Sequence, residues 1–174
     1  MQRQASDEAA RNLFVTGLRN AHALENQALE LMERQVERIE HYPDLAARLR
    51  QHLDETRVQR QRIENILAAL GTGTSALKDM ALSLFGTVAA IGNALAGDEI
   101  LKNCFANFAF EGYEIAAYKS LIVLAEATGH QDCIGPLDQS LREEQAMAAW
   151  LEENLGPVTL HYVSLAAGGM PAKR

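Results

Sequence analysis

Residues 105–126 read FANFAFEGYEIAAYKSLIVLAE, and this stretch decides the fold. Carboxylates interrupt its apolar pattern: Glu111 stands at one position of the pattern, and Glu114 follows nearly one turn later. A charge in the apolar middle of a helix costs several kcal/mol unless it is paired or binds a cation. The pattern predicts a long buried helix, because apolar residues recur at alternating steps of three and four at Leu101, Cys104, Phe108, Ile115, Tyr118, Ile122 and Ala125.

Three further long helices are expected around this one. Pro43 suits the first turn of a helix, and Gly71 and Gly129 suit helix ends. The breaks within each pair of helices are short, so each pair is expected to form an antiparallel hairpin, and the whole an all-α, four-helix up-down bundle. We predict these helices over residues 7–40, 44–70, 98–128 and 132–155.

The remaining segments are placed around the bundle. Residues 78–96 are apolar and rich in small side chains, and are expected to form a short helical crossover between the second and third helices. Residues 158–167 predict a last short helix, and the tail at about 168–174 is expected to be mobile. A chain of 174 residues suits one domain, so residues 1–174 are predicted to form a single domain with a core bundle at about 7–155.

The composition excludes several classes of protein. The net charge is −7 and the isoelectric point is about 5.2, so a basic face for nucleic acid is not expected. The two cysteines, Cys104 and Cys133, make no disulfide framework, which favours a reduced, cytoplasmic setting. The N-terminal residues lack the apolar segment of a secretion signal, and no window has the length of a membrane span. The expected protein is cytoplasmic and contacts neither nucleic acid nor membrane.

Carboxylates also lie in or beside the apolar patterns of the other three helices. Glu25 and Glu144 occupy such positions, and Glu55 lies beside the pattern of its helix, whose centre is polar. Thirty residues separate Glu25 from Glu55, and the same spacing recurs between Glu114 and Glu144. Each antiparallel hairpin is therefore expected to bring its two carboxylates to one depth. Four carboxylates in the bundle centre need protons or cations to neutralise them. Oxygen ligands with some imidazole suit iron or manganese.

Four short motifs resemble the YciE/YciF family of bacterial stress-induced, ferritin-like proteins. The resemblance implies a ferritin-like bundle, usually dimeric, with a dinuclear metal centre, and it implies no particular reaction. In the ferritin-like superfamily, two helices each give a Glu and the other two each give Glu-x-x-His. The motifs span most of residues 7–155 and are AHALENQ at 21–27, HLDET at 52–56 with Gln59, EGYEIAAY at 111–118 and LREEQ at 141–145.

The chain departs from the superfamily pattern at its histidines. Val58 and Met147 occupy the two positions where that pattern has histidine. His52 and Glu111, each about one turn before a candidate glutamate, are the candidates to replace the missing ligands, while His52 also suits a hydrogen-bonded histidine of the core. The candidate metal ligands, for a dinuclear iron or manganese centre, are Glu25, His52, Glu55, Glu111, Glu114 and Glu144.

Two classes of function stay open. In the first, the chain is a dinuclear metal protein with a role in a stress response. In the second, each carboxylate is paired with Arg or Lys of a neighbouring helix, and the chain is a metal-free helical dimer that binds a partner. A homodimer is expected, through the outer face of the first two helices or through the crossover, which carries Phe85, Val88 and Ile91.

Overall fold

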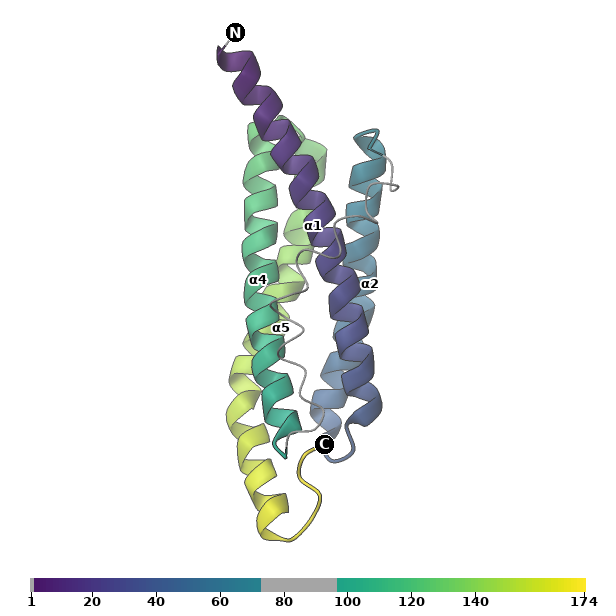
Figure 1. Ribbon diagram of the computed structural model, residues 1–174, viewed down its shortest axis with the longest axis vertical. Coiled ribbons are helices and arrows are strands. Elements are labelled where there is room, and N and C mark those ends of the chain that lie inside the picture. Colours follow the sequence, from purple (N-terminus) through teal and green to yellow (C-terminus); the bar gives the residue numbers. More distant parts are fainter. Residues whose placement is uncertain (1, 73–96) are drawn as a thin grey trace.

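The computed structural model describes residues 2–72 and 97–174, and these residues form four helices (Figure 1). No strand occurs in these two ranges, which confirms the all-α prediction. The predicted crossover helix lies outside the described residues. Within the described part of the chain, no helix has both the length and the apolar character needed to cross a membrane. The four helices are α1 (Gln2–Arg38), α2 (Pro43–Ala69), α4 (Glu99–Ala127) and α5 (Gln131–Ala167).

The helices are arranged as two antiparallel hairpins that face each other (Figure 1). α1 packs beside α2 and α4, and α5 packs beside α4 and α2. The chain leaves α2 at one end of the bundle and enters α4 at the other end, so α2 and α4 run in the same direction (Figure 1). This is the arrangement of a ferritin-like four-helix bundle, as the sequence predicts.

The inward face of α4 differs from the predicted one. Phe108 was expected to be buried, but it is 43% exposed and lies on the outer face. α4 is apolar around most of its circumference, so apolar spacing alone does not identify its inward side. Packing and polar contacts decide it: Asn107, for example, exchanges two side-chain hydrogen bonds with Gln35 of α1. The buried series that results is Ile100, Cys104, Asn107, Glu111, Glu114, Tyr118, Leu121 and Ala125.

Most helix ends follow the signals in the sequence. Pro43 opens α2. Gly71 and Gly129 follow α2 and α4 with φ angles of +69° and +76°, which is the left-handed conformation that favours glycine. α1 begins at Gln2, before the predicted start near residue 7.

α5 is longer than predicted, because it continues through Pro157 to Ala167. Proline lacks the amide N–H that would bond the carbonyl four residues earlier, so an end was expected there. Beyond the proline, Val158 is buried, and Tyr162 and Leu165 pack against the same apolar cluster. This burial offsets the lost hydrogen bond, and the separate last helix that was predicted is the final part of α5.

The C-terminal tail, expected to be mobile, folds back along the bundle in the structure. The phenol of Tyr42 donates a hydrogen bond of 2.6 Å to the carbonyl of Ala172, which is buried. The amide of Ile100 donates one of 3.0 Å to the carbonyl of Lys173. The tail therefore joins the turn between α1 and α2 to the start of α4.

Two apolar clusters fill the bundle, one on either side of a polar layer. One cluster lies toward the turn between α1 and α2 and includes Leu49 and Ile100. The other lies toward the opposite end and includes Phe14 and Leu137. Between them, all four helices contribute buried polar or ionisable side chains. This layer contains the candidate site.

Candidate metal centre

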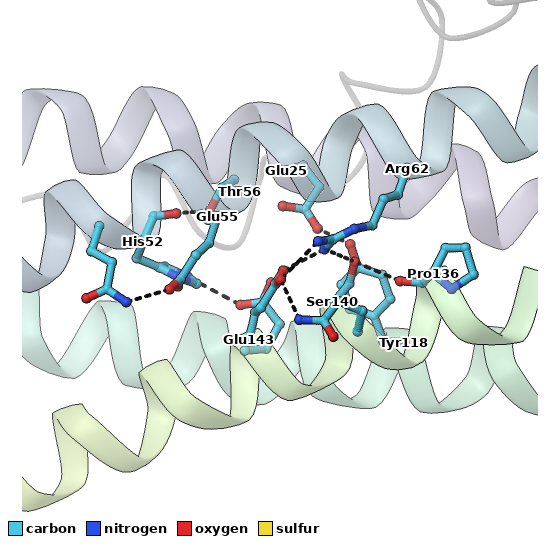
Figure 2. Close-up of polar contacts among 12 residues, drawn as sticks. Glu25, His52, Glu55, Thr56, Arg62, Tyr118, Pro136, Ser140 and Glu143 are labelled. Atoms are coloured by element: carbon cyan, nitrogen blue, oxygen red, sulfur yellow. Dashed lines mark hydrogen bonds and ion pairs between the residues drawn. The ribbon is translucent and has the colours of Figure 1, made fainter.

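Five ionisable side chains meet in the polar layer. Glu25 comes from α1, His52 from α2, Glu111 and Glu114 from α4, and Glu144 from α5, and none is more than 3% exposed. Each occupies an inward position in the three-and-four spacing of its helix, so packing of the helices turns all five toward the bundle axis. Figure 2 shows Glu25 and His52 entering this space from α1 and α2.

These side chains form two overlapping groups. One ligand atom from each of His52, Glu111 and Glu144 lies within 4.8 Å of the other two. The same holds for one oxygen from each of Glu25, Glu114 and Glu144. Glu144 belongs to both groups. Since a cation lies about 2 Å from each such ligand atom, three atoms at this separation can contact one ion. Each group could therefore hold a metal ion.

Glu55 is the one predicted ligand that lies outside both groups. Its side chain is 23% exposed, and its Oε2 lies 2.9 Å from Nδ1 of His52. Arg48 and Gln51 donate further hydrogen bonds to this carboxylate, at 3.2 Å and 2.8 Å. Glu55 comes one residue before the inward position of Thr56, and one residue turns a helix by about 100°. The expected convergence of Glu55 with the other glutamates is thus not seen, and Glu55 contacts the outer side of the histidine ring (Figure 2).

The contact with Glu55 orients the imidazole of His52. With Nδ1 held at the carboxylate of Glu55, the opposite nitrogen, Nε2, faces the cluster. It lies 3.2 Å from Oε2 of Glu111 and 3.3 Å from Oε2 of Glu144. A carboxylate that holds the outer nitrogen of a metal-binding histidine is a common arrangement in metal sites.

Several carboxylate oxygens in the cluster have no hydrogen-bond partner. Among the described residues, Oε2 of Glu25, Oε1 of Glu114 and Oε1 of Glu144 have neither a hydrogen bond nor an ion pair, while Oε2 of Glu111 and Oε2 of Glu144 face only Nε2 of His52. Within residues 2–72 and 97–174, no Lys or Arg forms an ion pair with these four glutamates; the ion pairs of Glu111 and Glu144 are with His52. Burying such oxygens without partners costs several kcal/mol. The donor set therefore fits a cation, and the alternative in which each glutamate is paired with its own Arg or Lys is not what the described residues show.

Burial raises the pKa of three of these glutamates. The pKa of Glu144 rises to about 8, with Glu111 adding to the effect of burial and His52 opposing it. The pKa values of Glu25 and Glu114 lie well above the usual range because of burial and the neighbouring charge of Glu144. Without a cation, the cluster therefore retains protons at neutral pH.

The pKa shifts of His52 and Glu55 favour a protonated imidazole beside an ionised carboxylate. Burial alone would lower the pKa of His52, but Glu111, Glu144 and Glu55 raise it to about 12. Burial opposes ionisation of Glu55 as well, yet hydrogen bonds from His52 and Gln51 lower its pKa to about 2. A metal ion on Nε2 would replace the proton that His52 otherwise carries there.

Two polar neighbours of the cluster were not among the predicted site residues. The phenol of Tyr118 donates a short hydrogen bond to Oε1 of Glu25, which leaves Oε2 of that carboxylate free (Figure 2). Gln59 is fully buried on α2, and neither end of its amide has a partner. The sequence feature that could have identified Gln59 is a polar side chain at an inward-facing position of α2.

We expect Glu55→Ala to weaken metal binding in the group that contains His52, by about tenfold to a hundredfold. The reason is that the imidazole loses the carboxylate that orients it, while all three ligands of the other group remain. Calorimetric titration with manganese measures the two affinities separately. Asp54→Ala is the control, since Asp54 is an exposed neighbour on the same helix. Equal losses in both groups would contradict this positioning role.

A ferritin-like bundle with buried carboxylates and one imidazole at its centre defines a class of protein: a four-helix protein whose core could hold a metal ion. Residues 9–164 match the family described as Domain of unknown function (DUF892), and the chain belongs to that family. The family match and the similar solved structures, which include the Escherichia coli stress protein YciF, together confirm the predicted resemblance to the YciE/YciF family.

Three solved structures show how far the likeness extends. A protein from Xanthomonas campestris is 30% identical over 91% of this chain and 99% of that chain, with a TM-score of 0.76. YcfI from Rhodopseudomonas palustris is 28% identical over 82% of this chain and 92% of its own, with a TM-score of 0.67. E. coli YciF is 22% identical over 84% of this chain and 94% of its own, with a TM-score of 0.72, and this last likeness is one of fold alone.

Proposed function

We propose that this chain is a dinuclear iron or manganese carboxylate protein. The observation that carries the proposal is the pair of buried groups that share Glu144, with unpartnered carboxylate oxygens in both. Two divalent cations would neutralise the glutamates and satisfy those oxygens. A set of oxygen ligands with one imidazole binds iron or manganese better than it binds metals that prefer thiolate ligands.

The residues of the chain have separate roles in this proposal. Glu144, which belongs to both groups, would help to hold both ions, while His52 would give one ion a nitrogen ligand through Nε2. Tyr118 holds Glu25 by its Oε1, which leaves the other oxygen for the second ion. Burial of the whole cluster limits its contact with water. Once bound, a pair of iron or manganese ions would supply one-electron chemistry toward dioxygen or peroxide.

We also propose a role in a stress response, in the cytoplasm. E. coli YciF is a stress protein, and this chain shares its fold over 84% of its length. A centre that consumes peroxide or sequesters iron would serve a cell under oxidative stress.

Metal loading tests the proposed function. We expect the chain, purified with chelator and dialysed against Fe²⁺ without oxygen or against Mn²⁺, to take up two ions and to gain thermal stability. Free metal at about 100 times Kd stabilises the fold by about 2.7 kcal/mol per ion. Elemental analysis gives the number of ions, and a melting curve gives the stability. A chain that takes up no ion and melts at the same temperature would exclude the proposal.

A second candidate function is that of a metal-free helical homodimer that binds a partner. The observation in its favour is a set of large apolar side chains on the outer face of α4, namely Phe105, Phe108, Tyr113 and Val123, all exposed. Apolar patches of this kind mark interaction surfaces. A homodimer is compatible with both candidates, so it is the loading experiment that separates them.

A further inference from the structure

Gln59 is the most poorly satisfied neutral side chain in the described core. It is 0% exposed, and both its Nε2 and its Oε1 lack a hydrogen-bond partner. The polar residue before it on the inward face of α2, Thr56, donates its hydroxyl to the carbonyl of His52 at 2.8 Å. The buried amide of Asn107 is likewise paired at both ends with Gln35. A buried amide without hydrogen-bond partners is costly, so something other than the described residues is expected to contact Gln59.

The register of the helices places Gln59 at the end of the cluster that lacks a nitrogen ligand. α2 and α4 run in the same direction, and His52 meets Glu111 with 3.2 Å between Nε2 and Oε2. Seven residues further along each helix, or about 10 Å, come Gln59 and Tyr118. Tyr118 donates its hydrogen bond to Glu25. Gln59 therefore lies at the level of Tyr118, the hydrogen-bond partner of Glu25, about one turn beyond Glu114.

The donor Nε2 and the acceptor Oε1 of Gln59 restrict the kinds of ligand that can form hydrogen bonds with its amide. A cation would contact only Oε1 and would leave the NH₂ group without an acceptor. A small neutral molecule with a hydroxyl group can accept from Nε2 and donate to Oε1 at once. Water and hydrogen peroxide are small molecules with this hydrogen-bonding chemistry.

We propose that Gln59 binds a small hydroxylic ligand, water or hydrogen peroxide, beside the Glu25, Glu114 and Glu144 group. The inference rests on the proposed metal function for its chemistry, because the neighbouring glutamates would hold the second ion. Gln59 then selects for a ligand that both donates and accepts a hydrogen bond.

The first test needs no metal and uses Gln59→Met, which keeps the length of the side chain and removes both amide groups. Since no protein partner is lost, we expect the metal-free variant to melt at the same temperature as the wild type or higher. Thr56→Val is the matched control on the same face, and it is expected to melt slightly lower because its hydroxyl is satisfied within the fold. A melting temperature for Gln59→Met below that of Thr56→Val would show that the amide has structural partners, and would overturn the proposal.

The second test uses the metal-loaded protein and separates the two ligands. If peroxide is bound, the peroxide concentration that gives half the maximal rate of iron oxidation rises about tenfold in Gln59→Met, the effect of losing two ordinary hydrogen bonds. If water is bound, that concentration is unchanged and the effect of bound Mn²⁺ on water proton relaxation changes instead. Equal behaviour of Gln59→Met and wild type in both measurements would overturn the role of Gln59 while leaving the metal site intact. A wild type that takes up no metal would overturn the proposed function itself.

Discussion

Glu144→Gln is expected to remove both metal ions from the protein at once. Glu144 is the one residue common to both groups of ligand atoms, so its loss leaves each group with two ligands from the chain. Glutamine keeps the shape of the side chain but supplies a single neutral oxygen, which cannot join two cations. The metal content after dialysis, measured by elemental analysis, is expected to fall from two ions per chain to none. The stabilisation by metal is expected to disappear with the ions.

Glu143→Gln is the matched control for this experiment. Glu143 is the preceding residue on α5, and its carboxylate is held by Arg62 of α2 through hydrogen bonds of 2.6 Å and 3.0 Å (Figure 2). Its loss is expected to lower the melting temperature and to leave two ions bound. A Glu144→Gln protein that still bound two ions would show that the glutamates do not share their cations in the proposed way.

The metal-free protein is expected to lose stability as the pH rises from about 5 to about 9. The folded pKa of Glu144 is about 8, above its ordinary value of 4.5. Its contribution is therefore complete below about pH 4.5 and is lost as the pH rises through 8. Glu25 and Glu114 have raised pKa values and act in the same direction. So does His52, whose folded pKa of about 12 means that its contribution is complete below its ordinary value of 6.5 and declines above it.

Glu55 acts in the opposite direction, because its folded pKa is lowered to about 2, and its contribution is lost only below about pH 4.5. The greatest stability of the metal-free protein is therefore expected near pH 5. Denaturant unfolding in the presence of chelator measures this, and the expected change is several kcal/mol, since each pKa unit corresponds to about 1.4 kcal/mol. Glu144→Gln is expected to flatten the profile. With metal present the trend is expected to reverse, since the ions compete with protons for the same oxygens. Stability of the metal-free wild type that increased steadily toward pH 9 would contradict the protonated cluster.

The sequence predicted the fold well because the signals that bound helices are local. Pro43, Gly71 and Gly129 act through the conformation of their own backbone, and the observed ends lie beside them. The presence of a buried polar site was also predictable. Burying a glutamate within an apolar pattern is costly in any bundle, so the sequence alone identifies Glu25 and Glu144 as candidate site residues.

The tertiary structure decided which way each helix faces. The matched spacing of thirty residues suggested that Glu55 is the counterpart of Glu144, yet α2 turns His52, Thr56 and Gln59 inward and leaves Glu55 at the rim. The sequence placed Glu55 beside the apolar pattern of its helix, and that position proved a better guide than the repeated spacing. On α4, which is apolar nearly all round, the pattern could not exclude Phe108 from the core.

The sequence alone therefore determined the helices, their breaks and the polarity of the bundle centre, because these depend on each residue and its neighbours along the chain. The ligand set, the unpartnered amide of Gln59 and the passage of α5 through Pro157 were decided by packing between helices. The physical reason is that no interaction within a single helix fixes its rotation about its own axis, while a rotation by one residue moves a side chain by about 100° and exchanges a ligand for a neighbour.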